Sequence, residues 1–447
     1  MTNDRREIFG WAMYDWANSA FSTTVITVLL GPYLTALAQG AVGENGQVWR
    51  FGPLGVVTAK SFFPYCIALS VVLQVFLLPV LGAIVDSTHM KKALMALCCY
   101  TGATATCLLF FVSGDRYRLG GLLLIVANVS FGASNVIYNA FLNDIATDDR
   151  RDAISSRGYA FGYLGGGTLL AANLALVSWA GALGISTGLA VRLSLLSAGL
   201  WWGGFAIVTF TRLEGRPASR SRRMHAAAGV GSVLNTIREL RRLPQTRRYL
   251  LAYMAFNDGI QTVIAIASVF LAQELFVAYG RDVDTSFLIG VTLMIQFVAF
   301  FGATLFERLA RTAGTKNAIL LSLVGWTGIV VYAYAFLSTT TEAWFMGAVL
   351  ALVLGGSQAL SRSLFSRMIP QGRETSFFGL YEISERGTSW IGPLIFGAVV
   401  GATNSYRHAI LSLIALFVTG IVVLLFTDTD RAIRDAGNRP IESAAGA

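Results

Sequence analysis

Long apolar runs separated by short polar segments dominate the pattern of this 447-residue chain. A membrane-spanning helix needs about 20 mostly apolar residues. Twelve runs reach that length, near residues 10–38, 56–85, 93–113, 119–141, 157–180, 188–210, 249–275, 285–306, 317–337, 343–364, 377–402 and 406–427. None of these runs alternates between apolar and polar residues as a strand of a membrane barrel does. The pattern predicts an all-α polytopic membrane protein with twelve transmembrane helices, with ends placed to within about four residues.

The composition supports this prediction, because 55% of the residues are hydrophobic and only 13% are charged. An average soluble protein has about 25% charged residues. A soluble globular enzyme, a disordered protein and a disulfide scaffold are therefore excluded. The first run carries Asp15 and is longer than the apolar core of a signal peptide, so we expect it to be the first span.

Most of the 34 Lys and Arg residues fall in alternate loops, beginning with the segment before the first run. Cytoplasmic loops of membrane proteins carry such an excess of basic residues. We therefore expect both termini to be cytoplasmic, with a bacterial inner membrane as the location. The net charge of +9 then reflects topology, and we expect no nucleic-acid partner.

The longest polar stretch divides the chain into two halves. It predicts an N-terminal six-helix bundle over 1–211, a basic cytoplasmic linker over 212–248 with a short surface helix near 233–243, and a C-terminal six-helix bundle with a short tail over 249–447. The first span of each half has a carboxylate three residues before an amide, Asp15 with Asn18 and Asp258 with Gln261. Duplicated bundles of this kind are used by transporters for alternating access.

Several segments resemble a known family of transporters. The run Gly82-Ala83-Ile84-Val85-Asp86 followed by Lys91-Lys92 resembles the loop signature of the major facilitator superfamily, although Ser87 and His89 depart from it. Four longer strings resemble its vacuole-effluxer-like branch, the autophagy-related protein 22-like group: Tyr14-Asp15-Trp16-Ala17-Asn18-Ser19-Ala20-Phe21, Gly162-Tyr163-Leu164-Gly165-Gly166-Gly167, Asn257-Asp258-Gly259-Ile260-Gln261-Thr262-Val263 and Gly355-Gly356-Ser357-Gln358-Ala359-Leu360-Ser361-Arg362-Ser363. The resemblance implies a twelve-helix secondary transporter, and fungal members are associated with amino-acid efflux from the vacuole.

Polar residues inside the spans are the candidates for transport, because a charge at mid-helix costs at least about 2.5–3.5 kcal/mol. They concentrate in the first, fourth, seventh and tenth spans, which the resemblance implies line the central cavity. The amides can instead serve as contacts between helices. The predicted substrate-binding residues are Tyr14, Asn18, Asn135, Tyr138, Asn139, Asn257, Gln261 and Gln358.

The carboxylates inside the spans are candidates for proton coupling: Asp15, Asp258, Glu382 and Glu385. Asp15 and Asp258 have an alternative interpretation as a helix cap or a latch between the bundles. Glu382 and Glu385 share a helix face, and we weigh a second proton or cation site against an inner gate closed by salt bridges. The predicted gating residues are Asp86, Lys91, Arg150, Arg151, Arg362 and Arg386.

Other classes of protein are less compatible with the sequence. No Walker motif for ATP is present, and the four cysteines lie in apolar runs without a metal-binding spacing. The three histidines fall in loops or at a span end, so we expect neither an enzyme nor a cofactor. Tryptophans near the predicted span ends (Trp11, Trp16, Trp201 and Trp202) are expected to anchor the chain at the membrane interface.

The sequence therefore predicts a monomeric secondary transporter that moves a small polar solute by alternating access. An amino-acid-like solute and proton-coupled efflux are the favoured interpretation. A nucleoside, sugar, peptide or lipid-like solute is the alternative, as is a transporter fold that acts as a sensor or scaffold.

Overall fold

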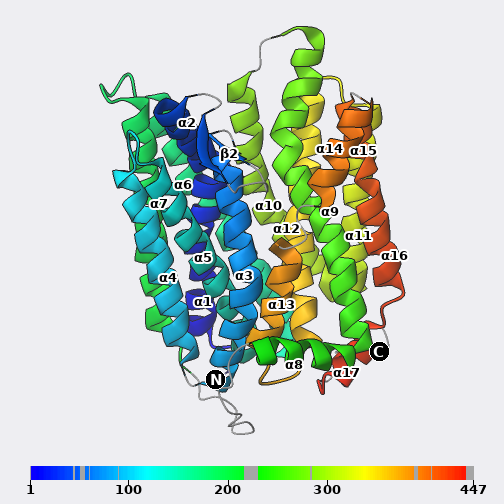
Figure 1. Ribbon diagram of the computed structural model, residues 1–447. Coiled ribbons are helices and arrows are strands. Elements are labelled where there is room, and N and C mark those ends of the chain that lie inside the picture. The colour runs from blue at the N-terminus through cyan, green and yellow to red at the C-terminus, as the bar shows by residue number, and fades with distance from the viewer. Residues whose placement is uncertain are drawn as a thin grey trace.

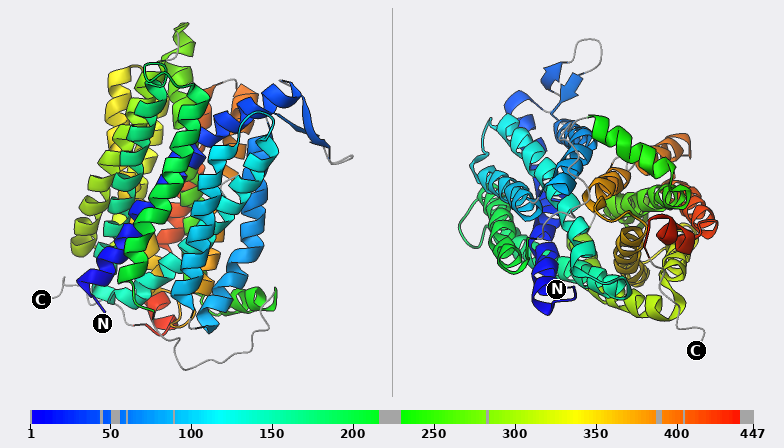
Figure 2. Two further views of the ribbon diagram at one scale, coloured as in Figure 1. Left: turned by 90° about the vertical axis from the view of Figure 1, so that its left-hand side faces the viewer. Right: turned by 90° about the horizontal axis from the view of Figure 1, so that it is seen from below.

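The computed structural model describes residues 2–43, 46–50, 56–59, 61–88, 90–215, 230–281, 284–386, 391–403 and 405–438. Helices run along one common direction and form an elongated bundle, with both termini at the same end (Figure 1). We refer to this end as the termini end. Seen along the bundle, the helices before and after residue 215 form two neighbouring groups (Figure 2). We refer to them as the N-terminal and C-terminal helices.

The N-terminal helices begin with one continuous helical segment that contains α1 (Arg5–Ala20), the π-helical stretch η1 (Phe21–Leu29) and α2 (Leu30–Val42). A short antiparallel hairpin of β1 (Gln47–Arg50) and β2 (Val56–Thr58) follows, with Trp49 opposite Val57. The remaining helices are α3 (Phe62–Ser87), α4 (Lys91–Leu108), α5 (Tyr117–Ile145), α6 (Arg151–Ser178) and α7 (Thr187–Arg212).

The C-terminal helices follow a short helix α8 (Val230–Arg241), which lies across the termini end (Figure 1). They are α9 (Pro244–Leu275), α10 (Thr285–Ala313), α11 (Thr315–Ala335), α12 (Thr340–Arg367), α13 (Glu374–Arg386), α14 (Ile391–Thr403), α15 (Tyr406–Ser412), α16 (Ile414–Leu425) and α17 (Thr429–Asp435).

Eleven helical segments among the described residues are long and apolar enough to cross a membrane. The predicted span 377–402 corresponds to two helices, α13 and α14, and residues 387–390 between them lie outside the described residues. The expectation of a polytopic helical membrane protein is confirmed. The predicted linker helix at 233–243 corresponds to α8.

The first span departs from regular α-helix at η1, where hydroxyl side chains bond to backbone oxygens of the preceding turn. Thr27 donates a hydrogen bond to the backbone oxygen of Ser22, five residues earlier, at 2.8 Å. Ser22 and Thr23 both donate to the backbone oxygen of Ser19. Side chains that bond to the preceding turn compete with the regular backbone pattern and bend helices. Wider π turns are accordingly found in such segments.

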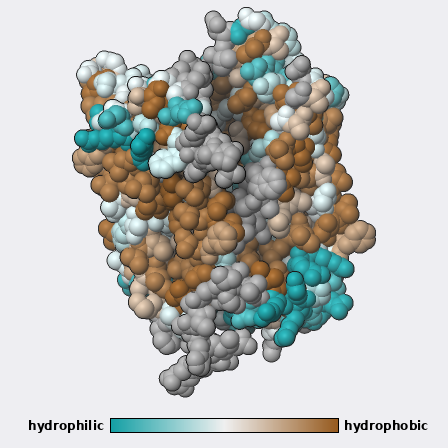
Figure 3. Space-filling view, viewed as in Figure 1, coloured by the Kyte–Doolittle hydropathy of each residue, from teal (hydrophilic) through white to brown (hydrophobic). Residues whose placement is uncertain are grey.

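Apolar side chains cover the middle of the outer surface, and polar residues gather toward the ends (Figure 3). Phe76, Phe345 and Phe426 are among the large side chains that are more than half exposed. An exposed apolar surface of this extent marks a membrane interface. The bundle is therefore surrounded by lipid along its middle.

Two of the tryptophans do not occupy the predicted interface positions. Trp11 and Trp202 are fully buried inside the N-terminal helices, so their prediction as membrane anchors is wrong. Trp202 packs against Phe21 and Phe131. Trp16 and Trp201 are half-buried and stack on one another, with ring centroids 5.6 Å apart. The aromatic rings fill the interior instead of marking the ends of the spans.

The two groups of helices meet where α3 packs against α13 and where α6 packs against α10 and α12. At the first contact the backbones approach closely, because Gly82 of α3 has no side chain. A Cβ atom at Gly82 would lie 2.7 Å from the backbone oxygen of Thr375 and 2.9 Å from the Cα of Ser376. This position therefore requires glycine for the helices to pack as they do.

We expect Gly82→Ala to lower thermal stability, because the added methyl group forces α3 and α13 apart. Overpacking of this kind costs about 1–3 kcal/mol. The matched control is Gly204→Ala in α7, where a Cβ meets nothing within 4 Å. Thermal unfolding of the purified protein in detergent measures both variants. An unchanged or higher midpoint for Gly82→Ala would contradict the close approach.

Candidate functional site

A buried arginine joins the two groups of helices near the centre of the bundle. Arg362 of α12 is 2% exposed. Its Nε donates to Ser155 Oγ at 2.9 Å and its Nη2 to the Ser155 backbone oxygen at 2.8 Å. Its Nη1 lies 3.4 Å from Asp15 Oδ2 and 3.3 Å from Asn139 Oδ1. One side chain from the C-terminal helices thus contacts α1, α5 and α6.

Aromatic rings enclose this guanidinium. Its central carbon lies 4.2 Å from the ring centroid of Tyr159, 4.8 Å from that of Trp11 and 5.5 Å from that of Tyr138. The faces of aromatic rings attract cations, most strongly when water is excluded. The enclosure therefore stabilises the positive charge of Arg362 inside the membrane.

The same rings hold the carboxylate of Asp15. The Tyr138 hydroxyl donates to Asp15 Oδ2 at 2.6 Å. Trp11 stacks on Tyr138 with centroids 4.4 Å apart and donates its Nε1–H to the Tyr138 backbone oxygen. A buried ion pair persists only where hydrogen bonds satisfy its remaining polar atoms. We refer to Trp11, Asp15, Tyr138, Ser155 and Arg362 as the arginine cluster.

Glu382 extends this arrangement toward α13. Asn139 donates through Nδ2 to Glu382 Oε1 at 3.1 Å, while its Oδ1 accepts from Arg362. Glu382 is 3% exposed. The amide of Asn139 therefore bridges a buried carboxylate and a buried guanidinium, with its NH₂ group facing the first and its oxygen facing the second.

A second ion pair between the two groups of helices was not found from the sequence. Arg367 Nη2 of α12 lies 2.9 Å from Asp152 Oδ1 of α6. Thr315 of α11 donates to Asp152 Oδ2 at 2.6 Å and accepts from Arg367 Nη1 at 3.1 Å. Asp152 and Arg367 lie in predicted loops between the spans, where charged residues are common. The hydropathy pattern therefore did not single them out as functional candidates. Their burial, at 8% and 4% exposure, is what distinguishes them.

Further contacts close the termini end. Asp86 at the end of α3 accepts from the backbone N–H groups of Thr375 and Ser376, at 3.0 and 2.8 Å, and from the Ser376 hydroxyl at 2.6 Å. It therefore caps the first turn of α13. Asn143 and Arg151 both donate to the Ser366 backbone oxygen. Each of these contacts joins helix ends that lie at the termini end.

Other predicted gating residues have different surroundings. Lys91 forms an ion pair with Asp144 at 2.7 Å, which joins α4 to α5 within the N-terminal helices. Arg151 pairs with Asp148 at 2.8 Å, and Arg150 is exposed. Glu385 and Arg386 belong to α13, but their side chains lie outside the described residues.

The predicted amides form pairs between helices. Asn18 donates to Asn135 at 2.7 Å, and Gln358 donates to Asn257 at 3.1 Å. Gln261 is half-buried, one turn along α9 from Asn257. Tyr14 is fully buried against Tyr138. The predicted residues of α1 and α5 therefore gather around the arginine cluster, whereas those of α9 and α12 form a separate pair.

Asp258 of α9 contacts the start of α14. Its Oδ2 accepts from the backbone N–H of Gly392, in the first turn of α14, at 2.8 Å. Asp258 is 1% exposed, and its Oδ1 has no hydrogen-bond partner among the described residues. A carboxylate at a helix N-terminus satisfies donors that the helix leaves unpaired.

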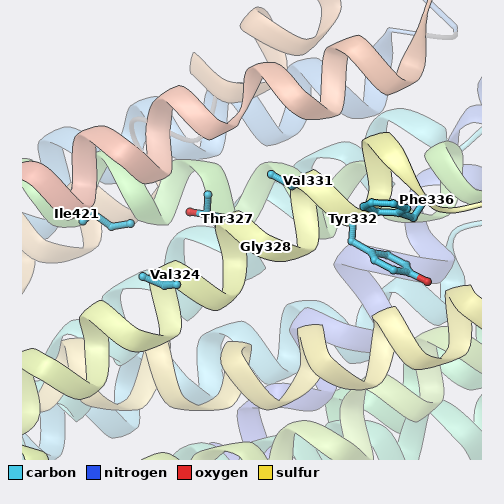
Figure 4. Close-up of a pocket in the computed structure, with 7 residues that line it drawn as sticks. All are labelled: Val324, Thr327, Gly328, Val331, Tyr332, Phe336 and Ile421. Atoms are coloured by element: carbon cyan, nitrogen blue, oxygen red, sulfur yellow. The ribbon is translucent and has the colours of Figure 1, made fainter.

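A surface pocket on the C-terminal helices contains none of these residues. It is lined by residues of α11, by Phe336 just after it and by Ile421 of α16 (Figure 4). Val324 and Phe336 are 57% and 63% exposed. This pocket is a groove in the apolar outer surface, where lipid chains lie, and apart from the hydroxyls of Thr327 and Tyr332 its side chains are apolar (Figure 4).

Solved structures with this arrangement of helices are transporters of the major facilitator superfamily. The transporter FucP in the outward conformation aligns with a TM-score of 0.67 and 12% identity, over 95% of this chain and all of that chain. The human organic anion transporter MFSD10 aligns with a TM-score of 0.65 and 15% identity, over 94% and 99%. The chain therefore shares the fold of these transporters.

Sequence comparisons give the family. Residues 3–437 match the family described as vacuole effluxer Atg22-like. The uncharacterized MFS-type transporter YxiO of Bacillus subtilis is 30% identical over 431 residues, 94% of this chain and 95% of the relative. Autophagy-related protein 22 of Kluyveromyces lactis is 25% identical over 479 residues, 97% of this chain and 95% of the relative. The chain therefore belongs to the Atg22-like family, which confirms the resemblance noted in the sequence.

We expect Arg362→Gln to destabilise the protein by about 3 kcal/mol, because it leaves a buried carboxylate without its cation. Asp15→Asn should cost less, since Arg362 keeps its bonds to Ser155. The double variant should cost less than the sum of the two, because no unpaired charge remains. Thermal unfolding in detergent measures the cycle, with the exposed Arg150→Gln as control. Strictly additive losses would show that Asp15 and Arg362 are not coupled.

Proposed function

We propose that this transporter moves a small polar solute of the amino-acid type by alternating access, as proton-coupled efflux. The observation that carries the proposal is the pair formed by Asp15 and Arg362, 3.4 Å apart and buried where the two groups of helices meet. An anion and a cation side by side match the two charged ends of a zwitterion. Breaking this pair offers each end of the solute a partner of opposite charge.

The amides near this pair suit the same class of solute. Asn18 and Asn135 bond to one another one turn from Asp15 and Tyr138 respectively. Each amide has both a donor and an acceptor. Gln261 and the pair of Asn257 with Gln358 supply equivalent groups from the C-terminal helices. We propose that a bound solute exchanges these contacts for its own.

The closed termini end supports alternating access as the mechanism. In the proposed cycle, the contacts of Asp86 with α13 and of Asp152 with Arg367 open and re-form as the two groups of helices rock. FucP, which has a similar fold, was captured in an outward conformation. With both termini in the cytoplasm, as the distribution of basic residues favours, the present conformation also corresponds to an outward-facing state.

Counterflow into proteoliposomes tests the solute class. The vesicles are loaded with unlabelled amino acids, sugars or nucleosides, and labelled solute is supplied outside. We expect counterflow with an amino acid. Gln261→Ala should weaken its apparent affinity about five-fold, the equivalent of one hydrogen bond of about 1 kcal/mol.

The control for this experiment is Thr327→Val in the lipid-facing groove, which should leave counterflow unchanged. Counterflow by another solute class, with no response to any amino acid, would reject the proposed substrate. Folding of each variant is checked by its unfolding midpoint.

Uphill transport driven by an imposed pH difference across the vesicle membrane tests proton coupling. Intramembrane carboxylates are the groups that exchange protons in secondary transporters. We expect an imposed proton gradient to drive uphill transport in wild-type vesicles. Asp258→Asn should abolish uphill transport while counterflow, which needs no driving ion, persists. Asp15→Asn should abolish uphill transport and also weaken counterflow, because Asp15 is the proposed partner of the positive end of the solute. Uphill transport that survives both substitutions would rule out these two carboxylates as the coupling groups.

A further inference from the structure

The short helix α8 has two different faces. Its inner face faces the bundle: Thr236 is 2% exposed, Leu240 packs against the core of the C-terminal helices, and Leu243 just beyond the helix is buried. Its outer face presents Arg238, Arg241 and the neighbouring Arg242, all exposed. The inner face of α8 is therefore covered by the protein, and its basic outer face points away from the bundle.

The basic surface continues into the first turns of α9. Arg247 and Arg248 are exposed, and Leu251, one turn after Arg247 on the same face, is 53% exposed. An exposed leucine on a spanning helix faces lipid chains. The two arginines therefore lie at the boundary between the apolar belt and the polar end of the bundle, where lipid headgroups are found. α8 lies across this end (Figure 1).

These five arginines have no acidic partner among the described residues. Arg238 bonds only to the side-chain oxygen of Asn235, at 3.3 Å. By contrast, Arg431 at the same end forms an ion pair with Asp435. We refer to Arg238, Arg241, Arg242, Arg247 and Arg248 as the basic face.

The inner face of α8 connects the basic face to the closed termini end. Arg373, which directly precedes α13, forms an ion pair with Glu239 at 2.7 Å and donates to Thr236 at 2.8 Å. The next residues of α13, Thr375 and Ser376, are those that Asp86 of α3 binds. α8 also packs directly against α3. A molecule that holds α8 in place therefore also holds the contact between α3 and α13.

We propose that the basic face binds the headgroups of anionic phospholipids, and that this binding stabilises the closed contact between α3 and α13. The position at the edge of the apolar belt and the unpaired positive charges favour a lipid phosphate over a soluble anion. Basic residues close to an anionic membrane surface are attracted to it. The inference is independent of the solute and the coupling ion, because none of these residues belongs to the arginine cluster.

Binding is tested by native mass spectrometry of the purified protein with dioctanoyl phosphatidylglycerol. We expect Arg241→Gln with Arg242→Gln to weaken the apparent affinity about thirty-fold, from about five-fold for each charge removed. The matched control is Arg431→Gln with Arg434→Gln in α17, at the same end and with the same change of charge, which should bind as wild type. Equal weakening in both double variants would reduce the effect to net charge and overturn the site.

Two further ligands separate the possible sources of the anion. Dioctanoyl phosphatidylcholine should bind weakly, since its headgroup carries no net charge. Inorganic phosphate should not displace phosphatidylglycerol. Displacement by phosphate at equal concentration would assign the basic face to a soluble anion and would overturn the proposal of a lipid site.

The effect on conformation is tested by the distance between spin labels at Met90→Cys and Gln371→Cys, with the four native cysteines replaced. Both positions are exposed, beside the ends of α3 and α13. We expect phosphatidylglycerol nanodiscs to increase the short-distance population relative to phosphatidylcholine nanodiscs. Glu239→Gln should keep lipid binding and lose this increase. An identical distance distribution in both lipids would overturn the link to closure.

Discussion

The buried guanidinium of Arg362 is the interaction on which the arrangement of the two groups of helices depends. A charge inside a membrane protein must be surrounded by compensating groups, and here those groups come from α1, α5 and α6, while the arginine itself comes from α12. Asp15 and Arg362 lie on opposite sides of the contact, so each of these two charges has its partner in the other group of helices. The conformation with the termini end closed pairs both of them. Any state that opens this end needs water or a solute in their place.

The remaining contacts at the termini end follow the same logic. Asp86 at the end of α3 and Asp152 at the start of α6 each bind a partner from the C-terminal helices. Asp152 and Arg367 are buried, at 8% and 4% exposure, so separating them without a replacement partner is also costly. Opening this end therefore requires water or a solute at both ion pairs.

Hydropathy predicted most of the fold, because a bilayer permits few alternatives for a long apolar run. It also found Asp15, Asn139 and Arg362, since polar residues stand out within apolar runs. Which of these residues meet was not predictable, because pairing depends on helix rotation and on contacts more than 200 residues apart. Asp152 and Arg367 were missed because they border polar loops, and Trp11 was misplaced because position near a span end does not distinguish an interface ring from a buried one. The division of this predicted span into α13 and α14 was also missed, although Glu382, Glu385 and Arg386 interrupt its apolar pattern.

The π-helical stretch η1 has a consequence for how the family can vary in sequence. Each turn of a π-helix contains more residues than an α turn. The first span therefore holds more residues at η1 than a regular α-helix with the same number of turns. Removing one residue from Phe21–Leu29 would convert wide turns to regular α turns and leave the rotation of α2 relative to α1 nearly unchanged. Removing one residue from the regular helix of α1 would instead rotate all that follows by about 100° and displace Tyr33, whose hydroxyl bonds to the backbone oxygen of Val112. The first span can therefore lose a residue within η1 more easily than within α1.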